Sequence, residues 1–378
     1  MFLAAAIGIF LFVLAAIFYS LSFVFEGKAL KNSRIAVAIL DAGLILGIYL
    51  YPRFLAGTTL PVSFLSVMLI SQIFLVILVT VAVSIRCIYR KIKKPTVFDP
   101  ERRRILRNAI LYPFLSFAIG LYGNNVERKK TVDRFYDIPI KDLPSELENF
   151  TIAQLSDIHL GKYYSLEDLR SLLERVANAK PDILAITGDV FDDVSMNDDA
   201  IKIIDSFCDR FKFGIWYCHG NHEHHRGIWA VEHGLEKTRI HWLVNRWESV
   251  GISNLVFIGV DYPMIWGDNE RFQKLKREYM VEAVENIPED STRILLAHHP
   301  EFMDDAQEYK IPLTMSGHTH GSQVGIFGIP LFPVFKYTRG MFKHGDFYGY
   351  VHVGNGSWFP YRFGCPPEIA YFHLKNKV

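Results

Sequence analysis

Hydrophobic residues follow two different patterns along this chain of 378 residues. In the first third they form long runs with few charges, which cover residues 1–25, 35–51, 60–85 and 105–122. A helix of about 20 apolar residues is long enough to cross the hydrocarbon core of a membrane. We therefore predict an all-α transmembrane region of about four helices at residues 1–125. The last run is the weakest, since it contains Arg107, Asn108 and Pro113.

The pattern changes after residue 125. A polar segment with Pro139 and Pro144 is predicted to be a linker over residues 126–149. From residue 150 to 378, short apolar runs alternate with amphipathic segments, as expected for an α/β domain with buried sheets. Strands are predicted at 151–155, 182–187, 213–218, 255–260, 293–297, 312–315, 348–353 and 368–373, and helices at 165–179, 198–210 and 269–286. Ser165 followed by Asp168 favours a helix start at that point.

Basic residues predict the orientation in the membrane, because short cytoplasmic loops are enriched in Lys and Arg. The first and third connections are basic and the second contains only Arg53. With four spans, the α/β domain faces the extracytoplasmic side of the cell membrane. If the fourth run does not span, the domain faces the cytoplasm, and Arg128, Lys129 and Lys130 mildly favour this second arrangement. Asp41 interrupts the second run, where an ionisable side chain either serves a function or faces other helices.

Composition narrows the classes of function. The net charge is +1, so bulk charge gives no reason to expect nucleic acid as a partner. The four cysteines contain no Cys-x-x-Cys pair, which disfavours a zinc ribbon or a redox pair.

Polar residues that can bind metal follow five of the predicted strands. They are Asp157 and His159, then Asp189, then Asn221 and His222, then His298, and finally His318 and His320. Because the carboxyl ends of parallel strands meet at one edge of a sheet, these side chains are expected to lie close together. Carboxylate and imidazole together suit manganese, iron or zinc. Two such ions about 3.5–4 Å apart can clamp the oxygens of an in-line phosphoryl displacement, and a shared carboxylate can bridge them.

The same residues carry a resemblance to a known family. Asp-x-His, Gly-Asp-x-x-Asp, Gly-Asn-His-Glu, Leu-Leu-x-His and Gly-His-Thr-His occur in this order within residues 157–320, and the chain resembles the calcineurin-like metallophosphoesterase superfamily. Residues 360–368 resemble a membrane-attached bacterial branch that includes lipid-processing pyrophosphatases. The resemblance implies an α/β fold in the form of a four-layer αββα sandwich. It also implies a phosphoesterase that uses two divalent metal ions.

Roles for individual residues come from this resemblance. It implies a first metal held by Asp157, His159 and His320, a bridging Asp189, and a second metal held by Asn221, His298 and His318. The choice of His298 over His299 follows from its spacing to the preceding leucines and the following proline. His222 would protonate the leaving oxygen or stabilise the charge that builds there. Asn221 could also contact a phosphate oxygen. Asp192 would not bind metal itself but would hydrogen-bond to the ligands and orient them.

Together these observations predict a membrane-anchored phosphohydrolase. Attack by a metal-bound hydroxide would cleave a phosphodiester or pyrophosphate, with manganese as the favoured metal. The expected partners are a lipid-linked or cell-envelope phosphoester and membrane lipids, and no nucleic acid. One alternative is a cytoplasm-facing pyrophosphatase of a UDP-linked acylated sugar. An alternative from another class is a membrane receptor or transporter whose α/β domain binds a ligand without catalysing a reaction. The apolar segment 326–342 is either ordinary loop packing or a lip that meets lipid.

Overall fold

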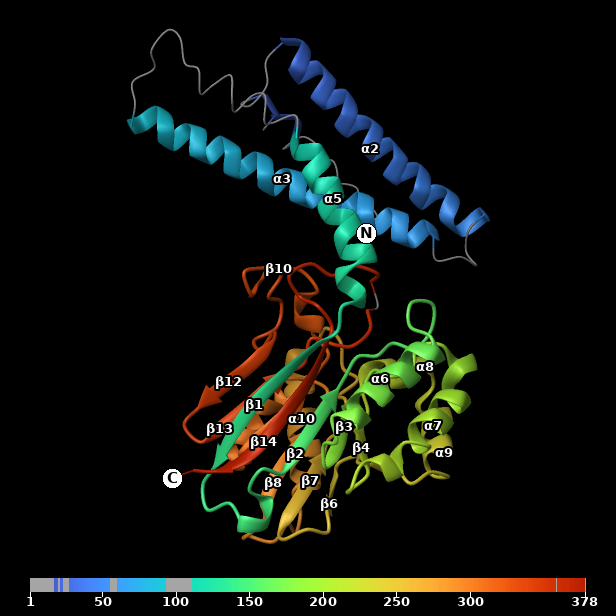
Figure 1. The fold of residues 1–378 in the computed structure, drawn as a ribbon, viewed down its shortest axis with the longest axis vertical. Coiled ribbons are helices and arrows are strands. Elements are labelled where there is room, and N and C mark those ends of the chain that lie inside the picture. The colour runs from blue at the N-terminus through green and yellow to red at the C-terminus, as the bar shows by residue number, and fades with distance from the viewer. Residues whose placement is uncertain are drawn as a thin grey trace. The chain divides into compact units, whose positions relative to one another are not determined.

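A computed structural model describes residues 17–19, 21–22, 27–54, 60–92, 111–357 and 359–377. The chain divides into two compact units, Met1–Val126 and Glu127–Val378. The helices of the first unit are α2 (Gly27–Phe54), α3 (Leu60–Ile92) and α5 (Leu111–Asn125) (Figure 1). The predicted span over residues 1–25 lies largely outside the described residues, as does the start of the predicted span over residues 105–122.

No helix in the described part of the first unit is both long enough and apolar enough to cross a membrane, so the spans predicted at residues 35–51 and 60–85 are not found there. Asp41 on α2 is buried, and its carboxylate accepts a hydrogen bond from the Gln72 amide on α3. The sequence offers no charged partner for Asp41, and the structure gives it a neutral one.

The second unit contains two six-stranded sheets. The first has the order β1 (Val132–Ile140), β14 (Glu368–Asn376), β2 (Thr151–Leu155), β3 (Ile183–Thr187), β4 (Ile215–Cys218) and β5 (His241–Trp242). The second has the order β12 (Gly340–His344), β13 (Phe347–Val351), β9 (Leu313–Ser316), β8 (Thr292–Leu296), β7 (Leu255–Gly259) and β6 (Arg246–Ser249). Strands β2 to β5 are parallel, and so are β7, β8, β9 and β13. A small separate hairpin joins β10 (Gly325–Ile326) and β11 (Ile329–Pro330).

Alternating burial in the strands produces the layers. On β8, Ile294 and Leu296 enter a core shared by both sheets, whereas Leu295 enters the core on the other face. The outer face of the first sheet packs against α6 (Leu166–Asn178), α7 (Asn197–Asp205) and α9 (Ile228–Leu235), and that of the second against α10 (Asn269–Ala283) and α11 (Phe302–Glu308). The short helix α8 (Asn221–Arg226) follows β4. The unit is therefore a helix–sheet–sheet–helix sandwich, because each strand has two apolar faces to cover.

Two local predictions have clear outcomes. Helix α6 starts at Ser165 as predicted, and Ser165 and Asp168 form a reciprocal capping box. The segment predicted as a linker contains a strand, since β1 occupies residues 132–140 and pairs in parallel with β14. Strand β1 lies at the edge of its sheet and only two of its nine residues, Ile138 and Ile140, are buried, which weakens the apolar pattern. An edge strand also tolerates Pro139, because the missing backbone N–H need not pair.

Candidate metal centre

The ends of five strands bring the predicted ligands together. Strands β2, β3 and β4 end at this edge in the first sheet, and β8 and β9 end there in the second. Two hydrogen bonds join the sheets at this place. Gln154 donates from Nε2 to the Ser316 carbonyl at 3.0 Å, and the His298 ring donates from Nδ1 to the Thr187 carbonyl at 2.6 Å. The two sheets are thus held at the separation that lets their strand ends share one site.

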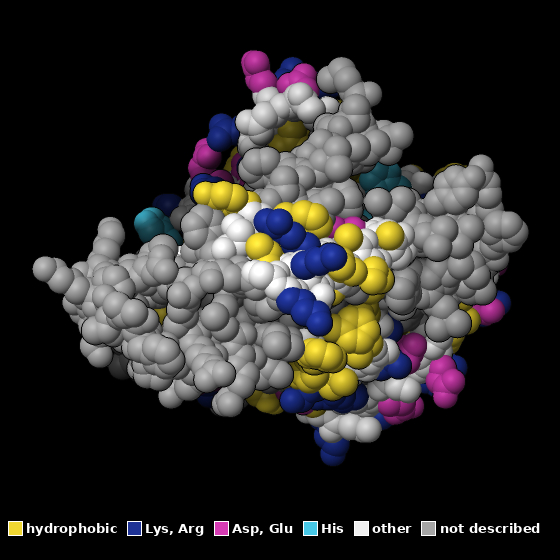
Figure 2. Space-filling view, turned by 90° about the horizontal axis from the view of Figure 1, so that it is seen from above, with side chains coloured by type: hydrophobic (Ala, Val, Ile, Leu, Met, Phe, Trp, Pro, Cys, Tyr) yellow, Lys and Arg dark blue, Asp and Glu magenta, His cyan; other side chains and the backbone are white. Residues whose placement is uncertain are grey.

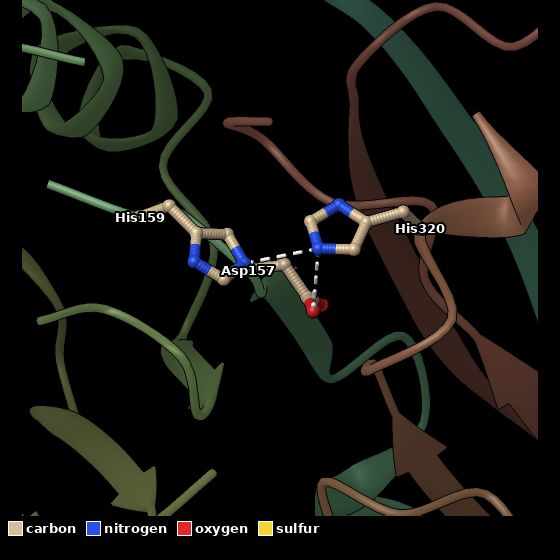
Figure 3. A group of neighbouring side chains, drawn as sticks. All are labelled: Asp157, His159 and His320. Atoms are coloured by element: carbon tan, nitrogen blue, oxygen red, sulfur yellow. Dashed lines mark hydrogen bonds and ion pairs between the residues drawn. The ribbon is translucent and has the colours of Figure 1, made fainter. Parts of the chain in front are cut away.

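The first cluster consists of Asp157, His159 and His320, all of them buried (Figure 3). One ligand atom from each residue lies within 4.8 Å of the others. Nε2 of His159 is 2.9 Å from Nε2 of His320, which in turn is 3.5 Å from Oδ1 of Asp157. Two imidazole nitrogens that face each other beside a carboxylate make a set of donors suited to a shared cation.

The second cluster consists of Asp189, His298 and His318. Nε2 of His298 lies 3.1 Å from Oδ2 of Asp189, and Nδ1 of His318 lies 2.8 Å from Oδ1 of Asn221. Oδ2 of Asp189 is also 3.8 Å from Nε2 of His159 in the first cluster. Asp189 therefore faces both clusters, which is the position required of a bridging carboxylate.

The neighbouring His299 differs from His298 in its surroundings. Its ring packs against Tyr262 and Phe272, with centroids 5.7 Å and 4.9 Å away. Burial lowers the pKa of His299 to about 3. His299 belongs to none of the clusters found among the described residues that could hold a metal.

His222 and Asp192 form a pair at the margin of the two clusters. Nδ1 of His222 is 2.5 Å from Oδ1 of Asp192, whose other oxygen is 3.1 Å from Nδ1 of His159. Nε2 of His222 lies 3.9 Å from Oδ2 of Asp189. These distances also place His222 in a potential ligand group with His159 and Asp189. Its side chain is 23% exposed, so His222 is reachable from solvent, whereas the neighbouring Asp189 is buried.

The electrostatics of the site favour cations. Burial lowers the pKa values of His318 and His320 well below the usual range, so both rings are neutral and their lone pairs are available. Burial also lowers the pKa of His298, but the charge of Asp189 outweighs it and raises the pKa to about 10. The buried carboxylates thus bind positive charge strongly, either as a proton or as a metal ion. Burial also lowers the pKa of His222, but the hydrogen bond to Asp192 and nearby carboxylate charges outweigh burial and raise this pKa.

The backbone around the ligands is strained. Five of the ligand candidates have left-handed φ angles of 51°, 52°, 55°, 72° and 50°, at Asp157, His159, Asp189, His318 and His320 respectively. Such a conformation costs about 1–2 kcal/mol for a residue with a Cβ atom. Each strand must turn sharply at its end to aim a short side chain at the common site. Gly188 helps because a Cβ atom there would lie 2.6 Å from the Gly220 nitrogen.

Glu223 holds these turns in place. Its buried carboxylate accepts hydrogen bonds from the backbone N–H groups of Gly220 at 2.8 Å, Asp189 at 3.0 Å, Val190 at 2.7 Å and Phe191 at 3.3 Å. The loop after β3 and the loop after β4 are therefore fixed to one side chain. Glu223 therefore positions both loops.

Sequence reasoning missed the support behind Asp157. Ser156 donates from Oγ to Oδ2 of Asp157 at 2.6 Å, and Asn355 accepts from the Ser156 backbone N–H at 3.0 Å. Arg362 is fully buried and donates to the carbonyls of Gly354 and Gly356 on either side of Asn355. The only sequence signal for this loop was the Gly354-Asn355-Gly356 turn that follows a predicted strand.

The described donors fit two divalent ions. Carboxylates, an amide oxygen and imidazoles form two adjoining clusters around Asp189, and Nδ1 of the buried His320 and Nε2 of the buried His298 make no hydrogen bond with the described residues. Such a mixed set of oxygen and nitrogen donors is typical of sites for manganese, iron or zinc.

Comparisons with known proteins point to the same chemistry. The family model described as calcineurin-like phosphoesterase matches residues 150–322. A metallophosphoesterase of Aquifex aeolicus is 31% identical over 70% of this chain and 99% of its own length. Phosphodiesterase YaeI of Escherichia coli is 27% identical over 60% of this chain and 82% of its length. A zebrafish (Danio rerio) protein named transmembrane protein with metallophosphoesterase domain is 27% identical over 71% of this chain and 63% of its own length.

The hydrogen bonds of Glu223 generate a prediction about stability and metal content. In Glu223→Gln, an amide NH₂ group replaces one acceptor oxygen and faces backbone N–H groups. The loss of hydrogen bonds to a buried charge should lower the free energy of unfolding by about 1.5–3 kcal/mol. We also expect less metal per chain, measured by elemental analysis beside thermal unfolding. The matched control is Glu236→Gln, at an exposed position. Equal stability and metal content in both variants would contradict the role of Glu223.

Proposed function

The chain belongs to the calcineurin-like metallophosphoesterase family, and on that premise we propose that its two adjoining clusters form the active site of a two-metal phosphohydrolase. The protein is a metal-dependent phosphoesterase. The observation that carries the assignment of this site is the position of Asp189, whose Oδ2 lies 3.1 Å from His298 and 3.8 Å from His159.

Our proposal for the ligands has two parts. Asp157, His159 and His320 hold one ion, Asn221, His298 and His318 hold the other, and Asp189 bridges them. Manganese is the favoured metal, since the donor set mixes carboxylate oxygen with imidazole nitrogen. When bound, the ions supply positive charge that acidifies a water molecule and offsets the charge on the phosphoryl oxygens. No side-chain nucleophile is then needed.

His222 is the proposed proton donor. Its Nδ1 is held by Asp192, which fixes the ring and leaves Nε2 on the side of Asp189. The raised pKa of His222 favours the protonated form of the ring. A protonated imidazole that is partly open to solvent can donate to the oxygen that leaves phosphorus. Asn221 precedes it, and its amide is placed to contact both a metal and a phosphate oxygen.

An apolar loop beside the site supports a lipid-linked phosphodiester or pyrophosphate as the substrate. The β10–β11 hairpin and the residues after it expose Phe327 fully, Val334 by 82% and Ile329 by 68%. The ring of Phe335 in the same loop lies 5.0 Å from the ring of His318, centroid to centroid. Apolar tips thus lie on the segment that also touches a proposed metal ligand. A substrate with acyl chains could place its phosphate at the centre and its chains on this loop.

The first unit is the proposed attachment to the membrane. Its helices expose Phe114 by 73%, Ile39 by 66% and Ile88 by 59%, which is what contact with lipid would cover. Figure 2 shows hydrophobic side chains directly beside Lys and Arg side chains on the face that it draws, a combination suited to anionic lipid surfaces. We place the phosphoesterase domain on the extracytoplasmic side. The basic third connection would be cytoplasmic, and a fourth span after it would carry the domain across the membrane.

Leaving-group dependence tests the role of His222. With Mn²⁺, the wild type should hydrolyse a 4-nitrophenyl phosphodiester and a matched alkyl phosphodiester, and Asp189→Ala should hydrolyse neither. His222→Ala should lower kcat/KM about 10²–10⁴-fold for the alkyl ester, whose leaving oxygen needs a proton. The loss should be much smaller for nitrophenolate, which leaves unprotonated. The control His225→Ala alters the exposed neighbour on α8. Equal losses on both esters would contradict the assignment.

Polar substitutions in the apolar loop test the substrate class. The double variant Phe327→Ser and Val334→Ser should lower turnover of a diacyl lipid phosphoester at least about tenfold, the effect of losing more than 1.4 kcal/mol of binding. Turnover of a small soluble ester should stay unchanged. Val281→Ser, at a 53% exposed position on α10, is the control. A parallel loss on both substrates would show that the loop only supports the fold.

Labelling in intact cells tests attachment and sidedness. The protein should remain with membranes after carbonate extraction, and Lys141→Cys should react with a membrane-impermeant maleimide. Lys31→Cys, in the first basic connection, should react only after lysis. Both positions are exposed in the structure. Release by carbonate would refute integral attachment. If Lys141→Cys reacts only after lysis and not in intact cells, the domain lies in the cytoplasm.

A further inference from the structure

A second group of metal-ligating side chains lies outside the centre. His219, His224 and Asp261 each offer one ligand atom, and these atoms lie within 4.8 Å of one another. None of the three belongs to the clusters around Asp189. His219 directly follows β4, His224 lies on α8, and Asp261 follows β7 of the second sheet.

Hydrogen bonding explains only part of this cluster. Nε2 of His224 is 2.8 Å from Oδ1 of Asp261, which is a normal hydrogen bond. His219 is completely buried, yet neither of its ring nitrogens makes a hydrogen bond with any described residue. Buried polar groups in proteins nearly always have a partner. Nε2 of His219 has no partner among the described residues, and its Nδ1 faces only the carboxylate of Asp261.

One distance in the cluster matches the spacing between two ligands of a metal ion. Nδ1 of His219 lies 3.4 Å from the same Oδ1 of Asp261. Two ligands of a tetrahedral ion with bonds of about 2.0–2.1 Å are about 3.3–3.4 Å apart. The corresponding pairs in the centre span 2.9 Å, 3.1 Å and 3.5 Å, so the cluster is as compact as the sites beside it. Two imidazoles and one carboxylate with a free fourth position are a ligand set typical of zinc.

We propose that His219, His224 and Asp261 bind a third metal ion of the Zn²⁺ class, separate from the two-metal centre. The backbone N–H of Asp261 donates to Oδ1 of Asn245 at 2.9 Å, which fixes the loop that presents the carboxylate. The side chains of His224 and Asp261 are 18% and 14% exposed, so an ion can enter from solvent and keep one water ligand.

The third ion would tie helix α8 to the second sheet. Helix α8 starts with Asn221 and His222, and His224 lies on its second half. Asp261 follows β7, on the other sheet. An ion shared by His224 and Asp261 would fix the helix that presents the proposed proton donor. This ion would bind whether or not the centre hydrolyses phosphoesters, so the two assignments fail independently.

Metal counting on the purified full-length protein tests the proposal. The protein is stripped with a chelator, dialysed against ZnCl₂, freed of excess metal and analysed for zinc per chain. The wild type and His225→Gln, the exposed neighbour on α8, should hold three equivalents. Asp261→Asn and His224→Gln should hold two. Two equivalents in the wild type, or three in both cluster variants, would overturn the proposal.

Anomalous diffraction at the zinc edge locates the ion without any variant, which covers the case in which the substitutions disturb folding. Crystals of the zinc-loaded wild type should show a peak between His219, His224 and Asp261 in addition to those of the centre. A map with peaks at the centre and none in this cluster would show that the three side chains only bond to one another.

Discussion

The carboxylate of Glu223 is the interaction on which the site depends. It accepts four backbone hydrogen bonds, three from the loop after β3 and one from the loop after β4. Five ligand candidates adopt left-handed backbone conformations, which the chain avoids unless its surroundings impose them. Glu223 acts directly on the one at Asp189. In the first cluster, hydrogen bonds from the Ser156 hydroxyl and the His318 backbone N–H fix the carboxylate of Asp157.

Electrostatics explain why such a strained arrangement is useful. Asp157 and Asp189 are buried and face imidazoles on both sides. Two carboxylates out of water are costly unless positive charge lies between them. In the family to which the chain belongs, that charge is supplied by two divalent ions. The same charge is then available to a phosphoester that enters beside His222. Strain, burial and catalysis are thus linked through the position of Asp189.

The sequence predicts most of the inner fold because the inner strands are short, largely apolar and soon followed by Gly, Asp or His, as β3 and β8 illustrate. Strand β1 was not predicted because Asp133, Arg134 and Asp137 interrupt its apolar residues, as an edge position allows. Strand β5 was not predicted because it has only two residues. The ligand candidates were found because they follow strands directly. The contact of Asn355 with Ser156 joins residues 199 positions apart in the chain, and local sequence patterns cannot reveal it.

The central claim is that water attacks phosphorus at the site formed by the five strand ends. Hydrolysis of an alkyl phosphodiester in H₂¹⁸O with Mn²⁺ tests it most directly. Mass spectrometry of a single turnover should find one ¹⁸O atom in the phosphate monoester and none in the alcohol, and Asp189→Ala should give no labelled product. Label in the alcohol, or a first-turnover product without label, would contradict direct attack of water on phosphorus.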